Sequence, residues 1–276
     1  MKRTLCLLFL VCTFTTVRAQ DLKLSKIDDC SMLFVYNYLM CDEHKNQASV
    51  KSFEMVLEVG KLYSKFYSSA KAYADSLFAL YANEPPQTAF LKILPQITGL
   101  NNHSFCDYYV FKNYPSPGTS AFLAYNAFGG AYKVEEKLQF DWKIDNNAKK
   151  MILGLNCQKA TCHFAGRNYE AWFTTDIPVN DGPYKFSGLP GLIVKVQDSD
   201  NEHIFELQEI KKVNNKPMYF PERAYTSTSA RGYTRVLEAS KTPLIEQLKS
   251  ATSDDPTTIP NAIARLQRRN NFIERY

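Results

Sequence analysis

The chain has 276 residues and a formal net charge of +5. Lys2, Arg3 and Arg18 contribute three of these charges, so residues 20–276 carry a formal charge of only +2 (5 − 3). Acidic and basic residues interleave in that part of the chain, whereas a nucleic-acid-binding domain gathers its positive charge into a stripe or patch. The composition therefore argues against a nucleic-acid partner, and the length allows one large β domain or two small ones.

Residues 1–19 have the features of a cleavable secretory signal peptide. Lys2 and Arg3 precede an apolar run, Leu5 to Phe14, that is too short to span a bilayer, and Ala19 supplies a small residue for signal peptidase. We predict cleavage after Ala19 and a single β-rich domain with a helical C-terminal tail over residues 20–276. The expected destination is the periplasm, the outer membrane or the medium. No later apolar run is long enough for a membrane helix, so we predict no transmembrane segment after cleavage.

Period-two alternation of apolar and polar residues predicts several strands. In Phe53–Val59, the apolar Phe53, Met55, Leu57 and Val59 alternate with Glu54 and Glu58, and a break at Gly60 predicts a hairpin with residues 63–67. Short turn-like connections between strands favour an antiparallel sheet. The other expected strands are 31–40, 134–144, 149–155 (after a turn at 145–147), 192–196 and 203–210.

Helical signals are few. An apolar face and the stop signal Pro85-Pro86 predict a helix over 70–81, and two more are expected from Thr242-Pro243 onward and over 260–270. The predicted fold class is therefore mainly β: a curved antiparallel sheet or half-barrel meander with two or three short helices.

Five cysteines remain after removal of the leader, and export to an oxidising compartment favours pairing of some of them. Cys157 and Cys162 flank four residues; if these form a hairpin turn, the two thiols face each other and pair. Cys30 and Cys41 bracket the first strand and are the second candidate disulfide. The alternative is that the cysteines are small buried apolar residues.

The most distinctive segment is 157–198. Within it, Gly188-Leu189-Pro190-Gly191 predicts a type II turn, with Pro190 setting φ at the second position and Gly191 supplying the positive φ of the third. A strand, Leu192 to Val196, follows. The segment is therefore expected to run as strand, loop, tight turn and strand.

The unaltered run Gly188, Leu189, Pro190, Gly191, Leu192, Ile193 resembles the signature of the GLPGLI family, exported proteins of diderm bacteria named after this hexapeptide. Flanking residues follow the same pattern, among them Gly166-Arg167, Ala171-Trp172, Asp176-Ile177-Pro178 and Gly182-Pro183. The C-terminal Asn270-Asn271-Phe272-Ile273-Glu274 departs from the family's Asn-Asn-Pro-Ile-Glu by one residue. The resemblance implies an exported protein and carries no established reaction.

A candidate functional surface lies in the loop 174–188, which we expect to be exposed. It combines Asp176, Asp181 and Lys185 with the nearby Arg167 and Trp172. Two carboxylates beside an aromatic ring suit a glycan site or a general acid/base pair. Aspartates before Pro or Gly are, however, common turn residues. Arg167 is expected to clamp one of these aspartates, with a ligand carboxylate as the alternative, and Trp172 is expected in the core.

No metal or cofactor is predicted. The histidines show no ligand spacing, and His103, Cys106 and Asp107 form only half of a ligand set. A phosphate-binding glycine loop is also missing. An aromatic-rich stretch, 108–128, remains open to two interpretations: binding of apolar or glycan ligands, or closure of one end of the sheet.

We therefore expect an exported periplasmic or outer-membrane-associated binding or accessory protein, with an envelope protein as candidate partner and no catalytic residue assigned. The first alternative is a secreted hydrolase, acting on glycans, that uses Asp176 or Asp181. The second is a component of a surface secretion or uptake assembly.

Overall fold

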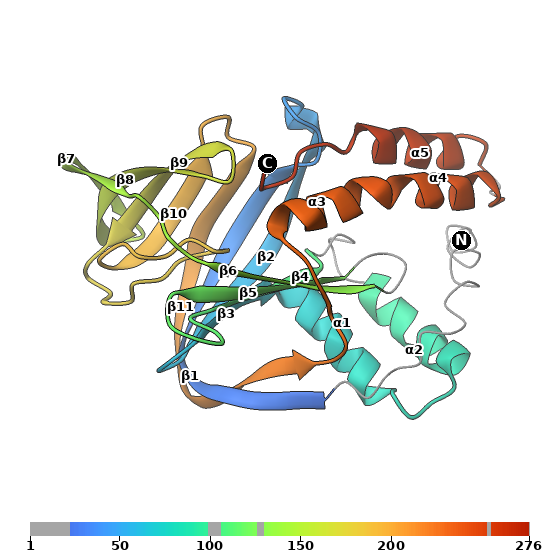
Figure 1. Ribbon diagram of the computed structural model, residues 1–276, viewed down its shortest axis with the longest axis horizontal. Helices are drawn as coiled ribbons and strands as arrows, with labels where there is room; N and C mark the ends of the chain where they lie inside the picture. Colours follow the sequence, from blue (N-terminus) through green and yellow to red (C-terminus); the bar gives the residue numbers. More distant parts are fainter. Residues whose placement is uncertain (1–22, 99–105, 126–129, 253–254, 276) are drawn as a thin grey trace.

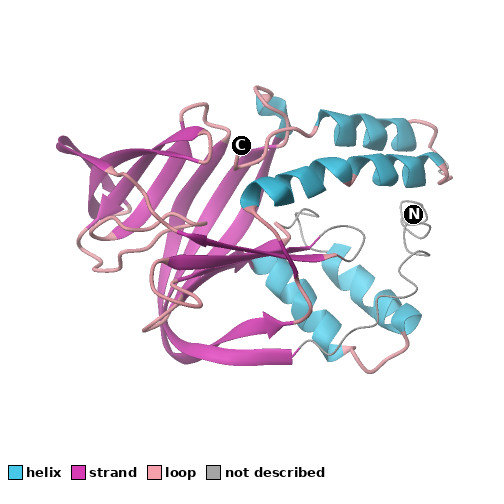
Figure 2. Cartoon of the chain, viewed as in Figure 1, coloured by secondary structure: helices cyan, strands magenta, loops and turns pink. Residues whose placement is uncertain are grey.

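The computed structural model describes residues 23–98, 106–125, 130–252 and 255–275 (Figure 1). The predicted signal peptide, residues 1–19, lies outside the described residues, as does His103. The described chain forms one large curled sheet with helices gathered on one side of the molecule (Figure 2).

The sheet has the strand order β12-β6-β5-β4-β3-β2-β1-β11-β10-β9-β8-β7. Strand β12 pairs with β6 in parallel, and the other pairings are antiparallel. The prediction of a mainly β, curved antiparallel fold is thus confirmed. The strands are β1 (Lys23–Cys41), β2 (Val50–Val59), β3 (Ser64–Ser68), β4 (Tyr108–Lys112), β5 (Thr119–Tyr125), β6 (Ala131–Lys137), β7 (Lys143–Ile152), β8 (Leu155–Phe164), β9 (Arg167–Thr174), β10 (Leu192–Asp198), β11 (His203–Glu222) and β12 (Thr226–Ser227).

Two groups of helices flank the strands β4, β5 and β6 (Figure 1). The first comprises α1 (Ser69–Leu80) and α2 (Pro86–Thr98), and the second α3 (Ala230–Ala239), α4 (Lys241–Lys249) and α5 (Thr258–Arg268). A single-turn 3-10 helix, η2 (Gln47–Ser49), lies between β1 and β2. None of the described helices has the length and apolar character needed to cross a membrane.

The helix prediction missed α2 and α3. Pro86, expected to stop a helix, instead begins α2, where the missing N–H of proline removes no intrahelical hydrogen bond. Helix α3 begins after Ser229, whose hydroxyl accepts a hydrogen bond from the Gly232 N–H at 3.0 Å.

The turn expected at 145–147 is also wrong. Strand β7 continues through these residues with an irregular register between Asp145 and Lys149. The reversal falls instead at Leu153-Gly154, with φ of 51° and 76°. Positive φ at both positions is what a two-residue hairpin turn needs.

Strands β4 and β5 are buried on both faces. Val110 and Phe122 belong to the main core on the concave side of the sheet. Phe111 and Leu123, which point the other way, pack in a second core with Phe220 of β11. The long antiparallel pair of β1 and β11 runs from Lys23–Glu222 to Met40–His203, so its far end is able to cover the back of β4 and β5.

Both candidate disulfides are wrong. Cys157 and Cys162 lie on the same strand, β8, and Cys30 and Cys41 lie on β1. Five residues along a strand span about 16 Å, far beyond the Cα separation of a disulfide. Cys106 is likewise a free thiol, and all of these five cysteines are buried, as the apolar alternative expects.

Candidate functional site

The hexapeptide 188–193 makes a different turn from the one predicted. The N–H of Gly191 donates to the carbonyl of Leu189 at 2.8 Å, which closes a three-residue γ-turn around Pro190. A type II turn would instead join Leu192 to Leu189, but the N–H of Leu192 donates to Ile177 at 3.3 Å. Proline suits the centre of either turn, so the residues alone did not separate them.

Two glycines allow the segment to pack tightly. A Cβ on Gly191 would overlap the carbonyl oxygen of Thr174 and lie 2.7 Å from its carbon. A Cβ on Gly182 would lie 2.7 Å from Cβ of Ile193. The Ile193 N–H donates to the Asp181 carbonyl at 2.9 Å, so the start of β10 is bonded to the loop that precedes the hexapeptide.

The loop 174–188 is exposed only in part. Residues 175, 176, 178 and 180 are exposed, whereas residues 181–186 are buried. Among the candidate acids only Asp176 is exposed, where it accepts the Asn156 N–H at 3.0 Å. Asp181 forms an ion pair with the buried Lys112. Burial lowers the pKa of Lys112, and the Asp181 carboxylate opposes that change. Asp181 is thus occupied by an internal partner.

Lys185 is also internal. Its ammonium is 1% exposed and bonds to Glu136 and, at 2.5 Å, to Glu274. Glu274 accepts the Tyr184 hydroxyl at 2.8 Å as well. Trp172 is partly buried and donates its indole N–H to Glu170 at 2.8 Å. The five candidate residues therefore do not share one surface.

Arg167 makes internal contacts, but to Asp198 and Glu202 rather than to Asp176 or Asp181. Its Nη1 lies 2.6 Å from Asp198 Oδ2 and 3.2 Å from Glu202 Oε2. Burial disfavours the Glu202 carboxylate, but the Lys45 N–H and the side chains of Arg167 and His44 outweigh it and lower its pKa to about 2. Arg167 is thus part of an internal ion-pair network with Asp198 and Glu202.

The same guanidinium holds the C-terminal tail, residues 271–275. Arg167 donates through Nη2 to Asn271 Oδ1 at 2.5 Å and to the Phe272 carbonyl at 2.7 Å. Further along, the Arg275 N–H donates to the Ala165 carbonyl at 2.8 Å. A Cβ on Gly166, which has φ of +77°, would overlap the Arg275 carbonyl oxygen, so the turn 165–166 fits the tail only with glycine.

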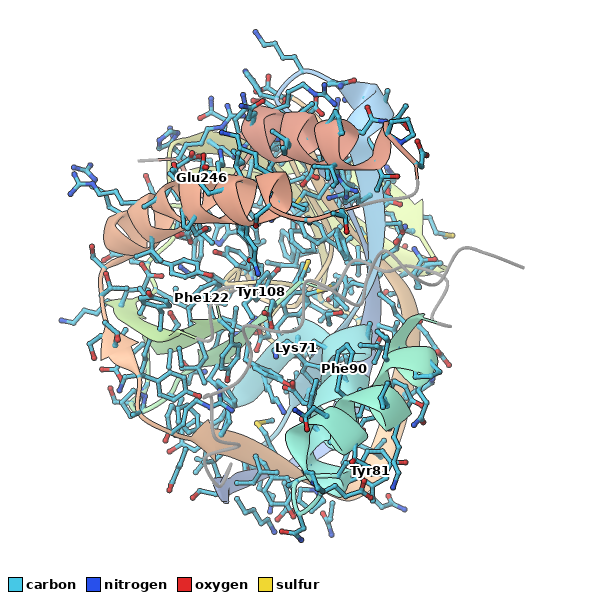
Figure 3. All side chains as sticks on the ribbon, turned by 90° about the vertical axis from the view of Figure 1, so that its right-hand side faces the viewer. Lys71, Tyr81, Phe90, Tyr108, Phe122 and Glu246 are labelled. Carbon is cyan, nitrogen blue, oxygen red and sulfur yellow. The ribbon has the colours of Figure 1, made fainter. Side chains whose placement is uncertain are left out.

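A cavity of about 490 Å³ lies between the concave face of the sheet, the tail 271–275 and helices α3–α5. Its wall is rich in aromatic rings, and Figure 3 shows Tyr108 and Phe122 near one another below the helix that carries Glu246. The ring centroids of Tyr108 and Phe122 are 5.2 Å apart, and those of Phe122 and Tyr233 are 5.5 Å apart. The aromatic lining comprises Tyr38, Phe53, Tyr108, Phe122, Tyr125, Tyr184, Tyr233 and Phe272.

The described aromatic side chains of the stretch 108–128 are divided between the two faces of the sheet. Tyr108, Phe122 and Tyr125 line the cavity, whereas Tyr109 packs on the opposite face of β4. Phe128 lies outside the described residues. The remaining cavity walls come from β1, β2, residues 184–185 and the chain from Ala230 to Glu274. No local pattern indicates that these remote segments meet.

Three cations line the cavity around one carboxylate. Lys51, Arg265 and Arg269 all face Asp42, with Nε of Arg269 at 3.4 Å and Nε of Arg265 at 3.8 Å from its oxygens. Burial lowers the pKa of Lys51, and the positive charges of the two arginines lower it further, whereas the Asp42 carboxylate acts to raise it. The cluster therefore carries more positive than negative charge.

The deep wall of the cavity holds Cys106 and Tyr108. Burial raises the pKa of the Cys106 thiol to about 12, so it is protonated at neutral pH and a poor nucleophile. The Tyr108 hydroxyl is buried beside it and has no oxygen or nitrogen partner among the described residues.

His44, Asp200 and Glu202 bring potential ligand atoms within 4.8 Å of one another. The His44 Nδ1 is 2.6 Å from Glu202 and 2.9 Å from the guanidinium of Arg275. A guanidinium at this distance repels a cation, and Glu202 already serves Arg167 and Arg275. The cluster is explained as part of the ion-pair network.

Comparison with known proteins adds one family. Residues 165–195 match the model of a family described as "Protein of unknown function (Porph_ging)". No curated protein matches the chain. Two solved structures of PNGF-II, in space groups P21 and C2, are similar at 13% identity and a TM-score of 0.49; the alignments cover 77% of this chain and 34% and 33% of those chains. The matched family segment is the one that begins at the tail-binding turn and ends in β10.

Proposed function

We propose that this protein is an exported member of the GLPGLI family, resident in the periplasm or at the outer membrane, that binds a small molecule in the cavity lined by α3–α5. Export rests on the signal-peptide features of residues 1–19, and the family on the hexapeptide 188–193 and its flanking pattern. No cofactor is part of the proposal.

The cavity is the observation that carries the binding function. A volume of about 490 Å³ is within the range of small-molecule sites, which are lined mainly by apolar and aromatic groups with a few polar ones. The aromatic lining and the polar groups of Tyr108 and Lys51 match that pattern.

The hydrolase alternative has less support. Asp181 is engaged by Lys112, Asp176 is bound to Asn156, and neither lines the cavity. The residues 188–193 are better explained as the tightly packed connection between β9 and β10.

The test is binding of a neutral apolar fluorophore, N-phenyl-1-naphthylamine, to the mature protein. We expect saturable binding that Leu237→Trp, which fills the cavity from α3, weakens at least about 10-fold. Leu80→Trp, on the 70% exposed Leu80 of α1, is the control and should leave the affinity unchanged. Absence of saturable binding, or equal loss in both variants, would contradict the proposed cavity site.

A further inference from the structure

One cluster in the cavity wall carries an excess of positive charge. Lys51, Arg265 and Arg269 share the single carboxylate of Asp42, which leaves this cluster with a net charge of +2. Asp42 is 5% exposed, whereas Lys51, Arg265 and Arg269 are 22%, 59% and 49% exposed. The carboxylate therefore lies behind the cations, and the cations present themselves to the cavity and to solvent.

The other acids in and around the cavity are held by other cations. Asp107 lies 2.9 Å from Lys71, which it shares with Asp75. Glu274 is bound to Lys185 at 2.5 Å, and Lys185 also pairs with Glu136. Glu43, close in sequence to Asp42 but outside the cavity lining, is paired with Arg268 at 3.0 Å. The Lys71 and Lys185 groups each carry a net charge of −1, so the positive excess is local to Lys51, Arg265 and Arg269.

Most of the remaining cavity wall is apolar. It includes Phe53, Phe122, Tyr233 and Leu237, together with the buried hydroxyl of Tyr108. The polar residues that also line it are Asp107, Lys185, Thr234, Ser240, Asn271 and Glu274. A ligand that fills the space must satisfy positive charge at one end and pack against rings elsewhere. Guanidinium groups recognise carboxylate, sulfonate and phosphate oxygens through paired N–H donors, and a partly desolvated cluster strengthens such contacts.

We infer that the ligand of this cavity is a small amphipathic anion, with its acidic head at Lys51, Arg265 and Arg269 and its apolar or aromatic body against Phe122 and Tyr233. This inference rests on the proposed binding function and specifies the ligand class. Binding of the head group relieves the mutual repulsion of the three cations, which share one carboxylate in the free protein. The Tyr108 hydroxyl supplies a polar contact deeper in the cavity.

Two fluorophores with the same aromatic body separate the head group from the body. 1-Anilinonaphthalene-8-sulfonate carries a negative charge, and N-phenyl-1-naphthylamine is its neutral counterpart. We expect the mature protein to bind the sulfonate at least about 10-fold more tightly, which is the contribution of one charge-assisted hydrogen bond. Raising NaCl from 50 to 500 mM should weaken binding of the sulfonate and leave the affinity for the neutral fluorophore unchanged.

Three variants of helix α5 locate the head group. Arg265→Gln and Arg269→Gln should each weaken binding of the sulfonate about 10-fold and binding of the neutral fluorophore less than about 2-fold. Arg268→Gln is the matched control, because Arg268 is 60% exposed on the same helix but pairs with Glu43 and does not line the cavity. It should leave both affinities unchanged.

The outcomes separate this inference from the binding function beneath it. Equal affinity for the two fluorophores, with both sensitive to Leu237→Trp, would overturn the anionic head and leave the cavity site standing. An equal effect of Arg268→Gln would show attraction to surface charge in general and would also overturn it. If neither fluorophore binds, the proposed function fails together with its ligand class.

Discussion

Gly191→Ala tests whether position 191 requires glycine because no Cβ atom fits against the neighbouring strand. The new methyl group would overlap the carbonyl oxygen of Thr174, and it would lie 2.7 Å from the Thr174 carbonyl carbon and 3.1 Å from Cα of Thr175. All three atoms belong to the backbone. Thr174 is buried and is registered with Leu192 on one side and Cys157 on the other, so its carbonyl moves only if two strand pairings adjust.

The expected cost follows from that immobility. Forcing extra volume into a packed site costs about 1–3 kcal/mol, and the upper end applies where backbone must move, so we expect a loss of about 3 kcal/mol. Gly188→Ala is the matched control in the same hexapeptide. Gly188 has φ of +88° but nothing within 4 Å of a Cβ, so only the backbone conformation is penalised, at about 1 kcal/mol.

Urea unfolding at 25 °C measures both variants, with tryptophan fluorescence as the signal. Trp142 reports directly on this region, since its indole N–H donates to the Ser187 carbonyl at 2.8 Å. The two free-energy losses should differ by about 2 kcal/mol, with Gly191→Ala the larger. If Gly188→Ala costs as much or more, the close approach to Thr174 is not the reason for glycine at position 191.

Three further predictions concern buried charge. Arg167→Met should lower the free energy of unfolding by about 3–5 kcal/mol, because Asp198 and Glu202 lose their buried cation. It should also make the tail 271–275 accessible to trypsin. An unchanged rate of tryptic cleavage would contradict the contact between Arg167 and the tail. Asp181→Ala, which the turn pattern alone predicts to be mild, should lower the free energy of unfolding in urea by about 3 kcal/mol. Adding Lys112→Met should restore part of the lost stability. A loss below about 1 kcal/mol in the single variant would argue against the ion pair. Burial holds the pKa of His203 well below 6.5, so below about pH 6.5 the unfolded chain binds a proton that the folded chain does not, and stability should fall as the pH drops. His203→Gln should reduce the pH dependence of the unfolding free energy between about pH 6.5 and 5. An unchanged dependence would mean that other groups cause it.

Local pattern predicts β2, which has an exposed residue on one face, and misses β4 and β5, which are buried on both faces. Alternation in β2 is visible because Met55 and Leu57 are buried while Glu54 is exposed. In β4 and β5 both faces are covered, so apolar residues occupy consecutive positions and no alternation remains. A stretch such as Tyr108–Lys112 is then hard to tell from an aromatic loop.

The candidate site was misjudged for a different reason. Lysine is almost always at the surface, so Lys112 and Lys185 give no sign that they are buried. Their partners are remote: Asp181 lies 69 positions from Lys112, and Glu274 lies 89 positions from Lys185. Spacing misled in the same way for Cys157 and Cys162, because a short separation along the chain fits both a hairpin and one continuous strand.

The pairing of β1 with β11 also dictates when the protein is able to fold. Strands β2 to β6 follow one another in space as they do in sequence, apart from the helical insertion after β3, and so do β7 to β11. The two runs are joined by β1, whose partner ends at Glu222. A chain leaving the ribosome therefore has β1 to β6 complete long before β11, the strand that unites the two runs. Such long-range pairing slows folding, so the two runs join only when most of the chain has been made.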